Sequence, residues 1–223
     1  MTDHVVMSLA TVPDIDALRL IHQFDELSDE GVLSAALHLH HQRHGNKNLP
    51  LYQQQIVSVA AVKYMESGEL ALHGFDNDAE NELERLVQLN EFVGKAKQII
   101  SWEMNSFDLP LMNYRLLKHT IISANFYAAA KVDLSECLSN TREGKADLAG
   151  LSKSIGLPDI DSMTQQDRIE CFLSKQMQSI HTANQSKLLN SYFIHLRHRL
   201  VSAELASAEY EAAREKLFEA LRA

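Results

Sequence analysis

The chain has no apolar run long enough to cross a membrane. None of its hydrophobic stretches approaches the ~20 residues that a spanning helix needs. Residues 1–7 include no basic segment followed by an apolar stretch, so the sequence predicts no signal peptide. We therefore expect a cytoplasmic protein without membrane contact.

Cysteine is scarce as well. Cys137 and Cys171 are the only two among 223 residues, and they lie far apart and outside any Cys-x-x-Cys spacing. This pattern indicates neither a disulfide framework nor a thiolate metal site. We expect two reduced, buried thiols.

Positive charge is in deficit. The chain has 21 Lys and Arg against 30 Asp and Glu, which gives a formal net charge of -9. A chain this acidic has no overall attraction to a polyanion, which argues against tight, non-specific DNA binding. The charge does not exclude an enzyme that binds phosphates through metals.

Hydrophobic patterning predicts strands first, then helices interleaved with short strands. We expect strands at 5–9, 56–64, 70–75 and 98–102, with an extended segment at 131–134. We expect helices at 14–24, after Ser28, at 77–95 and 108–119, and almost continuously from Gly144, including 202–223. This order predicts one α/β domain, residues 1–223, with a mixed central sheet, a hairpin, flanking helices and a helical C-terminal part.

The most specific stretch is 102–119, WEMNSFDLPLMNYRLLKH. Its Asn-x-Phe-Asp-x-Pro core, followed by Tyr-Arg and Lys-His, resembles the second exonuclease motif of predicted 3'-5' exonucleases related to the proofreading domain of family-B DNA polymerases. Further segments resemble that family in the same order: 11–14, 48–50, 132–134 and 189–197. The resemblance covers nearly the whole chain and implies a ribonuclease-H-like fold.

The resemblance also implies a chemistry. Members of that family cleave with two metal ions, usually Mg²⁺ or Mn²⁺, on either side of the scissile phosphate. Four carboxylates hold the metals: an Asp-x-Glu on the first strand, an Asp in the second motif and an Asp on the last helix. A Tyr one helical turn before the last Asp helps to orient the water.

This sequence retains one of those four carboxylates, Asp108. The other matching positions hold residues that are not carboxylates: Ser8 and Ala10 on the first strand, Lys187 at the last Asp and Ala183 at the Tyr. A shifted register does not supply the acids, because 8–13 and 183–187 contain no Asp or Glu. One carboxylate facing a lysine lacks both the ligand number and the charge for two divalent cations.

Each of the two charged positions has two interpretations. Asp108 is either a remnant metal ligand or the N-cap of the following helix, and we expect the cap, worth about 1 kcal/mol. Lys187 is either a new phosphate-binding residue or an ion-pair partner of Asp108. We expect the ion pair, with Nζ within about 4 Å of the carboxylate.

Other polar residues are candidates for weaker roles. The resemblance places a vestigial nucleic-acid groove along Asn105, Phe107, Tyr114 and Arg115, whereas we expect Asp133 to stabilise the turn that follows it. His40 and His44 have the i,i+4 spacing of a Zn²⁺ chelate, but no nearby acid or cysteine completes it, so we expect a solvated helix face. The same interpretation is preferred for the basic cluster of His195, Arg197, His198 and Arg199.

Three functional hypotheses follow. The first is a degenerate, inactive exonuclease-like protein that acts through binding or scaffolding, with an unidentified protein partner and no metal cofactor. The second is an active 3'-5' exonuclease on DNA or RNA that uses Mg²⁺ or Mn²⁺ in a rearranged site. The third is weak binding of single-stranded nucleic acid without cleavage. We favour the first, because the acids are lost while the motifs that carry the fold remain.

Overall fold

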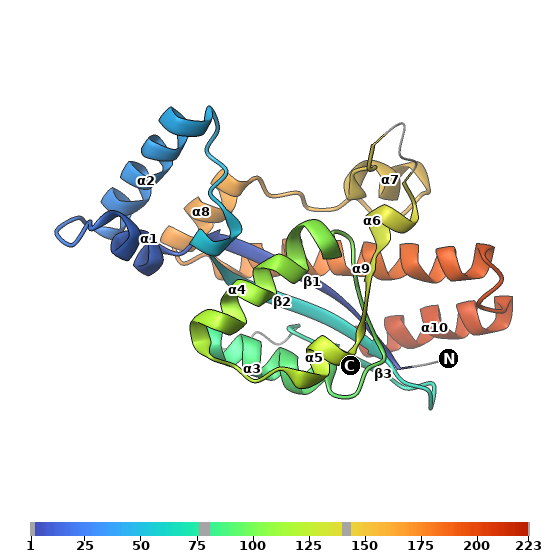
Figure 1. Cartoon of the computed structure of the whole chain (residues 1–223). Helices are drawn as coiled ribbons and strands as arrows, with labels where there is room; N and C mark the ends of the chain where they lie inside the picture. Colours follow the sequence, from blue (N-terminus) through green and yellow to red (C-terminus); the bar gives the residue numbers. More distant parts are fainter. Residues whose placement is uncertain (1–2, 76–80, 140–143, 223) are drawn as a thin grey trace.

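The computed structural model describes residues 3–75, 81–139 and 144–222. Within them, a mixed sheet has the strand order β3-β2-β1-β4-β5 (Figure 1). β1 runs antiparallel to β2 and parallel to β4, and β2 and β3 form a hairpin. The predicted mixed sheet with a hairpin is confirmed. The strands are β1 (His4–Pro13), β2 (Gln54–Tyr64), β3 (Leu70–His73), β4 (Gln98–Ser101) and β5 (Ala130–Asp133).

Helices cover both faces of the sheet (Figure 1). One face packs against α3 (Glu82–Val93), α4 (Leu109–His119) and α5 (Ala124–Ala128), and the other against α9 (Met177–Val201) and α10 (Ser207–Ala220). The predicted helix at 77–95 begins at Glu82 with Asn81 as its cap, while Asn77 lies outside the described residues. The final segment, 202–222, contains the shorter helix α10, which packs by one face through Tyr210, Ala213 and Leu217.

Side chains of β1 alternate between these two layers. Val5 and Met7 pack with the α3 and α4 side, whereas Val6 packs with the α9 side. Because strand side chains have a period of two, Ser8 and Ala10 follow Val6 toward α9. The strand is longer than predicted, and it ends at Pro13, which pairs with Gln54.

The α1–α2 hairpin lies beyond the end of β1 (Figure 1). α1 (Ile15–His22) begins after the cap residue Asp14, and α2 (Asp29–His44) begins after Ser28, whose Oγ accepts a hydrogen bond from Gly31 N at 3.2 Å. The predicted Ser28 cap is confirmed. The remaining elements are η1 (Leu51–Gln53), the π-helical turn η2 (Met104–Asp108), α6 (Leu134–Cys137), α7 (Leu148–Ser154) and α8 (Gln165–Leu173).

Neither cysteine is fully buried, so that part of the prediction is wrong. Cys137 is exposed at the end of α6, and Cys171 is partly exposed on α8. Both are free thiols. Cys137 ends a four-residue helix at the surface, whereas Cys171 packs against the cluster of Val12, Val57 and Ile180 and is only partly covered there.

A buried ionic network lies where β1 ends, on the face of the sheet that α3 and α4 cover. Arg115 of α4 is 1% exposed, and its Nη1 lies 2.8 Å from Asp14 Oδ2. Its Nε donates to Glu82 Oε1 at 2.7 Å, and its Nη2 pairs with Glu82 Oε2. Glu82 Oε1 also accepts the backbone N–H of Ile56 at 2.5 Å. The network therefore joins the end of β1 to β2, α3 and α4.

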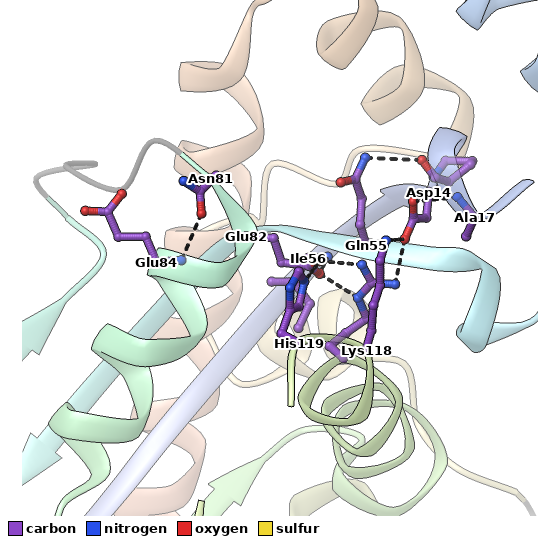
Figure 2. A network of polar contacts seen from close by, with 11 residues as sticks. Asp14, Ala17, Gln55, Ile56, Asn81, Glu82, Glu84, Lys118 and His119 are labelled. Atoms are coloured by element: carbon purple, nitrogen blue, oxygen red, sulfur yellow. Dashed lines mark hydrogen bonds and ion pairs between the residues drawn. The ribbon is translucent and has the colours of Figure 1, made fainter. Parts of the chain in front are cut away.

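Two further residues of α4 complete this network (Figure 2). Lys118 Nζ lies 2.5 Å from Asp14 Oδ2, and His119 Nε2 lies 2.8 Å from Glu82 Oε2. Burial by itself raises the pKa of Asp14, but Lys118, the Ala17 N–H and Arg115 hold this pKa below its usual value. Asp14 is therefore held as a carboxylate inside the fold.

We predict that Arg115→Met lowers the free energy of unfolding by about 3–5 kcal/mol, because it leaves two buried carboxylates without their main partner. Urea unfolding of the variant and the parent chain measures this difference. Arg214→Met is the matched control, since Arg214 is paired with Glu211 at 2.8 Å on the exposed helix α10. It should cost no more than about 1 kcal/mol. Equal losses in the two variants would contradict a special role for the buried network.

Candidate functional site

A cavity of about 490 Å³ lies between β1, the segment after β4, and α9. We call it the β1–α9 cavity. All five positions singled out by comparison with the exonuclease motifs line it: Ser8, Ala10, Asp108, Ala183 and Lys187. Three sequence-distant segments thus meet at one place. On α9, residues 183 and 187 are one helical turn apart and so share a face.

Ser8 and Ala10, the two β1 positions that match the family's first-strand acids, form contacts with uncharged groups. Ser8 Oγ donates to Asn184 Oδ1 at 2.8 Å, and Asn184 Nδ2 donates to Ser8 O at 3.0 Å and to Ser58 Oγ at 3.1 Å. Ala10 packs beside Ile180 of α9. An amide and two hydroxyls therefore hold β1, β2 and α9 together where a metal-binding member would have charged acids.

Asp108 does not cap α4, so the capping prediction is wrong. Its backbone is already helical, with φ -68° and ψ -45°, and its carboxylate accepts no capping hydrogen bond. The reason is η2, in which the Asp108 N–H bonds to Glu103 O at 3.1 Å. The helical path thus begins before Asp108, and its carboxylate lines the β1–α9 cavity instead.

Burial has the largest effect on the pKa of the Asp108 carboxyl, which is 5% exposed. It raises the pKa to about 7. The nearby Ser101 hydroxyl and the Lys187 ammonium lower this pKa, whereas Glu103 and Asp133 raise it. The Ser101 oxygen lies close enough to act electrostatically, although it forms no hydrogen bond of normal geometry.

Lys187 forms no ion pair with Asp108, so this prediction is wrong too. Within the described ranges, no carboxylate oxygen lies within 4.0 Å of its ammonium. The side chain stays partly open to solvent in the cavity, where water solvates the ammonium. The surrounding walls still lower its pKa by burial, Arg168 lowers it further, and Asp108 and Glu103 raise it.

A second cation of the cavity is Arg168 of α8. Its Nε donates to Thr11 O at 3.1 Å and its Nη1 to Met163 O at 2.9 Å. No carboxylate of the described chain lies within 4.0 Å of this guanidinium. The sequence offered no signal for this residue, because α8 carries no recognisable motif and only the fold brings it to the end of β1.

Only part of the predicted nucleic-acid groove lies at the cavity. Phe107 lines it, together with Trp102 and Glu103, which the sequence analysis had not singled out. Arg115 is in the buried ionic network, so its assignment to a groove is wrong: Asp14 and Glu82 hold it inside the fold.

The other two groove candidates are elsewhere on the surface. Asn105 does not line the cavity, and its side chain bonds Glu136. Tyr114 is 43% exposed and makes an edge contact with Tyr52. Asp133 has the structural role expected of it, since it accepts the Glu136 N–H at 3.0 Å and the Ser135 hydroxyl at 2.6 Å.

The histidine clusters differ in burial. His195 is 6% exposed against His4, and burial lowers its pKa to about 3, so the prediction that it belongs to a solvated basic face is wrong. The large ring packs inward because α9 is covered by the sheet and α10. The rings of His40 and His44 lie with their centroids 4.4 Å apart and their planes tilted by 31°.

The donor set does not fit the two-metal arrangement. No three His, Cys, Asp or Glu side chains of the described residues lie together so as to hold a metal ion. Hard divalent cations need several oxygen ligands, and Lys187 and Arg168 add positive charge at the same place. The residues at the family's four acid positions are therefore unsuited to a pair of Mg²⁺ or Mn²⁺ ions.

Comparisons with known proteins identify the family and the fold. A family model described as "predicted 3'-5' exonuclease related to the exonuclease domain of PolB" matches residues 46–223, a range that includes Asp108 and Lys187 but not Ser8. A family-B DNA polymerase from the hyperthermophilic archaeon Pyrobaculum calidifontis has a similar fold, with a TM-score of 0.55 at 10% identity.

That similarity covers 88% of this chain and 25% of the polymerase, so the chain spans about a quarter of the polymerase's length. The likeness confirms the predicted α/β fold, with its mixed sheet flanked by helices. No curated protein matches the chain. No helix of the described segments is both long and apolar enough to span a membrane.

We predict that Asp108→Asn stabilises the protein more at pH 8 than at pH 5. A carboxyl whose folded pKa is raised contributes stability that is present at low pH and is lost as pH rises through the folded value, here about 7. The whole loss, between about pH 4 and pH 7, has an upper bound on the order of 4 kcal/mol, of which roughly 2–3 kcal/mol falls between pH 5 and pH 8, and the Asn variant avoids it. Urea unfolding between pH 5 and pH 8 measures the difference. Asp25→Asn, at an exposed position, is the control, and its effect on the free energy of unfolding should be the same at pH 5 and pH 8. The same result for Asp108→Asn would contradict the raised pKa.

Proposed function

Because the chain belongs to the family of predicted 3'-5' exonucleases related to the exonuclease domain of PolB, we propose that it is a degenerate member that binds without cleaving. Its role is then binding or scaffolding in the cytoplasm, with single-stranded nucleic acid or a protein as the partner. The observation that carries the proposal is the placement of Lys187 and Arg168 in the β1–α9 cavity, where members with four acids hold cations.

Hydrolysis by the family's route requires a group that generates hydroxide near neutral pH. Bound metals do this by lowering the pKa of water. Ser8 and Asn184 are engaged with each other, and Ala183 has no hydroxyl to orient a water. The cavity thus retains a shape suited to a ligand while it lacks the groups that activate the attacking water.

A second candidate function is supported by Glu103, which lines the cavity. Glu103 lines the cavity together with Asp108, and it raises the pKa of Asp108, so the two carboxylates are electrostatically coupled. Mg²⁺ is commonly held by one or two carboxylates plus waters and substrate phosphates. The alternative is therefore an exonuclease with a rearranged site, in which Glu103 and Asp108 hold Mg²⁺ or Mn²⁺.

We predict no Mg²⁺- or Mn²⁺-dependent degradation of end-labelled single-stranded DNA or RNA by the purified chain. Two of the three lost acids are replaced by neutral side chains and the third by a cation, which repels the metal. Gel analysis over a range of metal concentrations measures this. Activity that disappears in both Asp108→Ala and Glu103→Gln would overturn the proposal and support the rearranged site.

A metal titration separates the two candidates without relying on turnover. Millimolar Mg²⁺ should not raise the melting temperature of the parent chain above a control at matched ionic strength, because a ligand stabilises only a fold that binds it. The variant Ser8→Asp/Ala10→Glu/Lys187→Asp, which restores the four acids, should show a saturable rise. A saturable rise in the parent chain would count against the proposed function.

A further inference from the structure

Two positive side chains of the β1–α9 cavity lie near each other without a carboxylate partner. Arg168 is close enough to Lys187 to lower the pKa of that amine. Neither side chain has a carboxylate within 4.0 Å among residues 3–75, 81–139 and 144–222. Neighbouring like charges repel, and an anion bound between them would relieve that repulsion.

Two of the three guanidinium nitrogens of Arg168 form hydrogen bonds within the protein, which leaves the third for a ligand. Its Nε and Nη1 donate to the carbonyls of Thr11 and Met163, which fixes the guanidinium against the end of β1. No hydrogen bond from Nη2 to another described residue accompanies them. Guanidinium and ammonium groups form strong, charge-assisted hydrogen bonds with phosphate oxygens.

The cavity also has surfaces for a flat ring. Trp102 and Phe107 both line it, and aromatic side chains stack on nucleobases. A volume of about 490 Å³ lies in the range typical of small-ligand sites. The dimensions and the aromatic lining therefore favour a ligand larger than an inorganic anion.

Among the described residues, four acids line the cavity and restrict where an anion can bind: Glu103, Asp108, Asp147 and Asp161. Glu103 and Asp108 are close enough to raise the pKa of Lys187, so at longer range they offset its charge. Asp147 is already engaged, since its Oδ1 accepts the Gly150 N–H at 2.7 Å. A phosphate must consequently contact Lys187 and Arg168 directly, and it gains little from the cavity's overall field.

We propose that the β1–α9 cavity binds a nucleoside monophosphate unit without a metal, with the phosphate on Lys187 and Arg168 and the base against Trp102 or Phe107. The inference rests on the proposed function, because it treats these cations as the replacement for the family's metals. The unit is either a free nucleotide or the terminal nucleotide of a single strand, which share this chemistry.

Trp102 provides a built-in reporter, since it is the only tryptophan of the chain. Titration of the whole protein with adenosine 5'-monophosphate in excess EDTA should give a saturable change in tryptophan fluorescence, with the affinity confirmed by calorimetry. Lys187→Met should weaken binding by at least ~10-fold, because it removes a charge-assisted contact. Lys187→Arg should retain binding.

Lys97→Met is the matched control. It removes the same charge from an exposed lysine that pairs with Glu66 at 2.8 Å and does not line the cavity. Its affinity should stay within about 2-fold of the parent value, as expected when an exposed charge acts only at long range. Equal weakening by Lys97→Met and Lys187→Met would overturn the site.

Three further ligands test the chemistry. Adenosine and inorganic phosphate should each bind more weakly than the nucleotide, and equal binding of phosphate would overturn the role of the aromatic walls. A short oligonucleotide that competes with the nucleotide identifies a strand end as the source, whereas failure to compete assigns the site to the free nucleotide. Absence of any saturable binding in EDTA overturns the inference alone, while metal-dependent cleavage overturns the proposed function.

Discussion

The buried contact between Arg115 and the two carboxylates of Asp14 and Glu82 fixes the relation between the sheet and the helices around it. Asp14 ends β1, Glu82 begins α3 and bonds the start of β2, and Arg115 lies on α4. Charges buried to this degree are tolerated only when each has a partner, so these four elements cannot shift independently. Since Asp108 directly precedes α4, the same contact determines how far that carboxylate lies from the middle of β1.

This arrangement preserves a cavity at the place where family members have acids. In a four-acid site the carboxylates repel each other until cations neutralise them. Here Ser8 and Asn184 exchange neutral hydrogen bonds, and Lys187 and Arg168 supply permanent positive charge. A four-acid site needs cations, whereas this cavity presents two cations, Lys187 and Arg168, that have no carboxylate within 4.0 Å among the described residues. The packed layers around the sheet and the buried ionic network both contribute to the stability of the fold.

Local rules predicted the elements well where neighbouring residues decide the outcome. The Ser28 cap and the β2–β3 hairpin both follow from short-range chemistry. The same rules failed for Asp108, because the π-helical turn η2 moves the start of the helix upstream. They failed for Arg115 and His195, because burial depends on which layers close over α4 and α9. The convergence of Ser8, Asp108 and Lys187 was predicted only through the family resemblance, since no local rule joins positions so far apart.

By itself, the sequence determined the α/β class, because hydrophobic periodicity is a property of the chain alone, and it gives the identity of Ser8, Ala10 and Lys187. That these three positions match acids of the family is what the resemblance implies. Only the tertiary structure decided that Lys187 stays apart from Asp108, that Arg168 joins it and that Arg115 is buried. The physical reason is that ionic partners are chosen by distance and dielectric environment. Both quantities arise only when α4, α8 and α9 pack around β1.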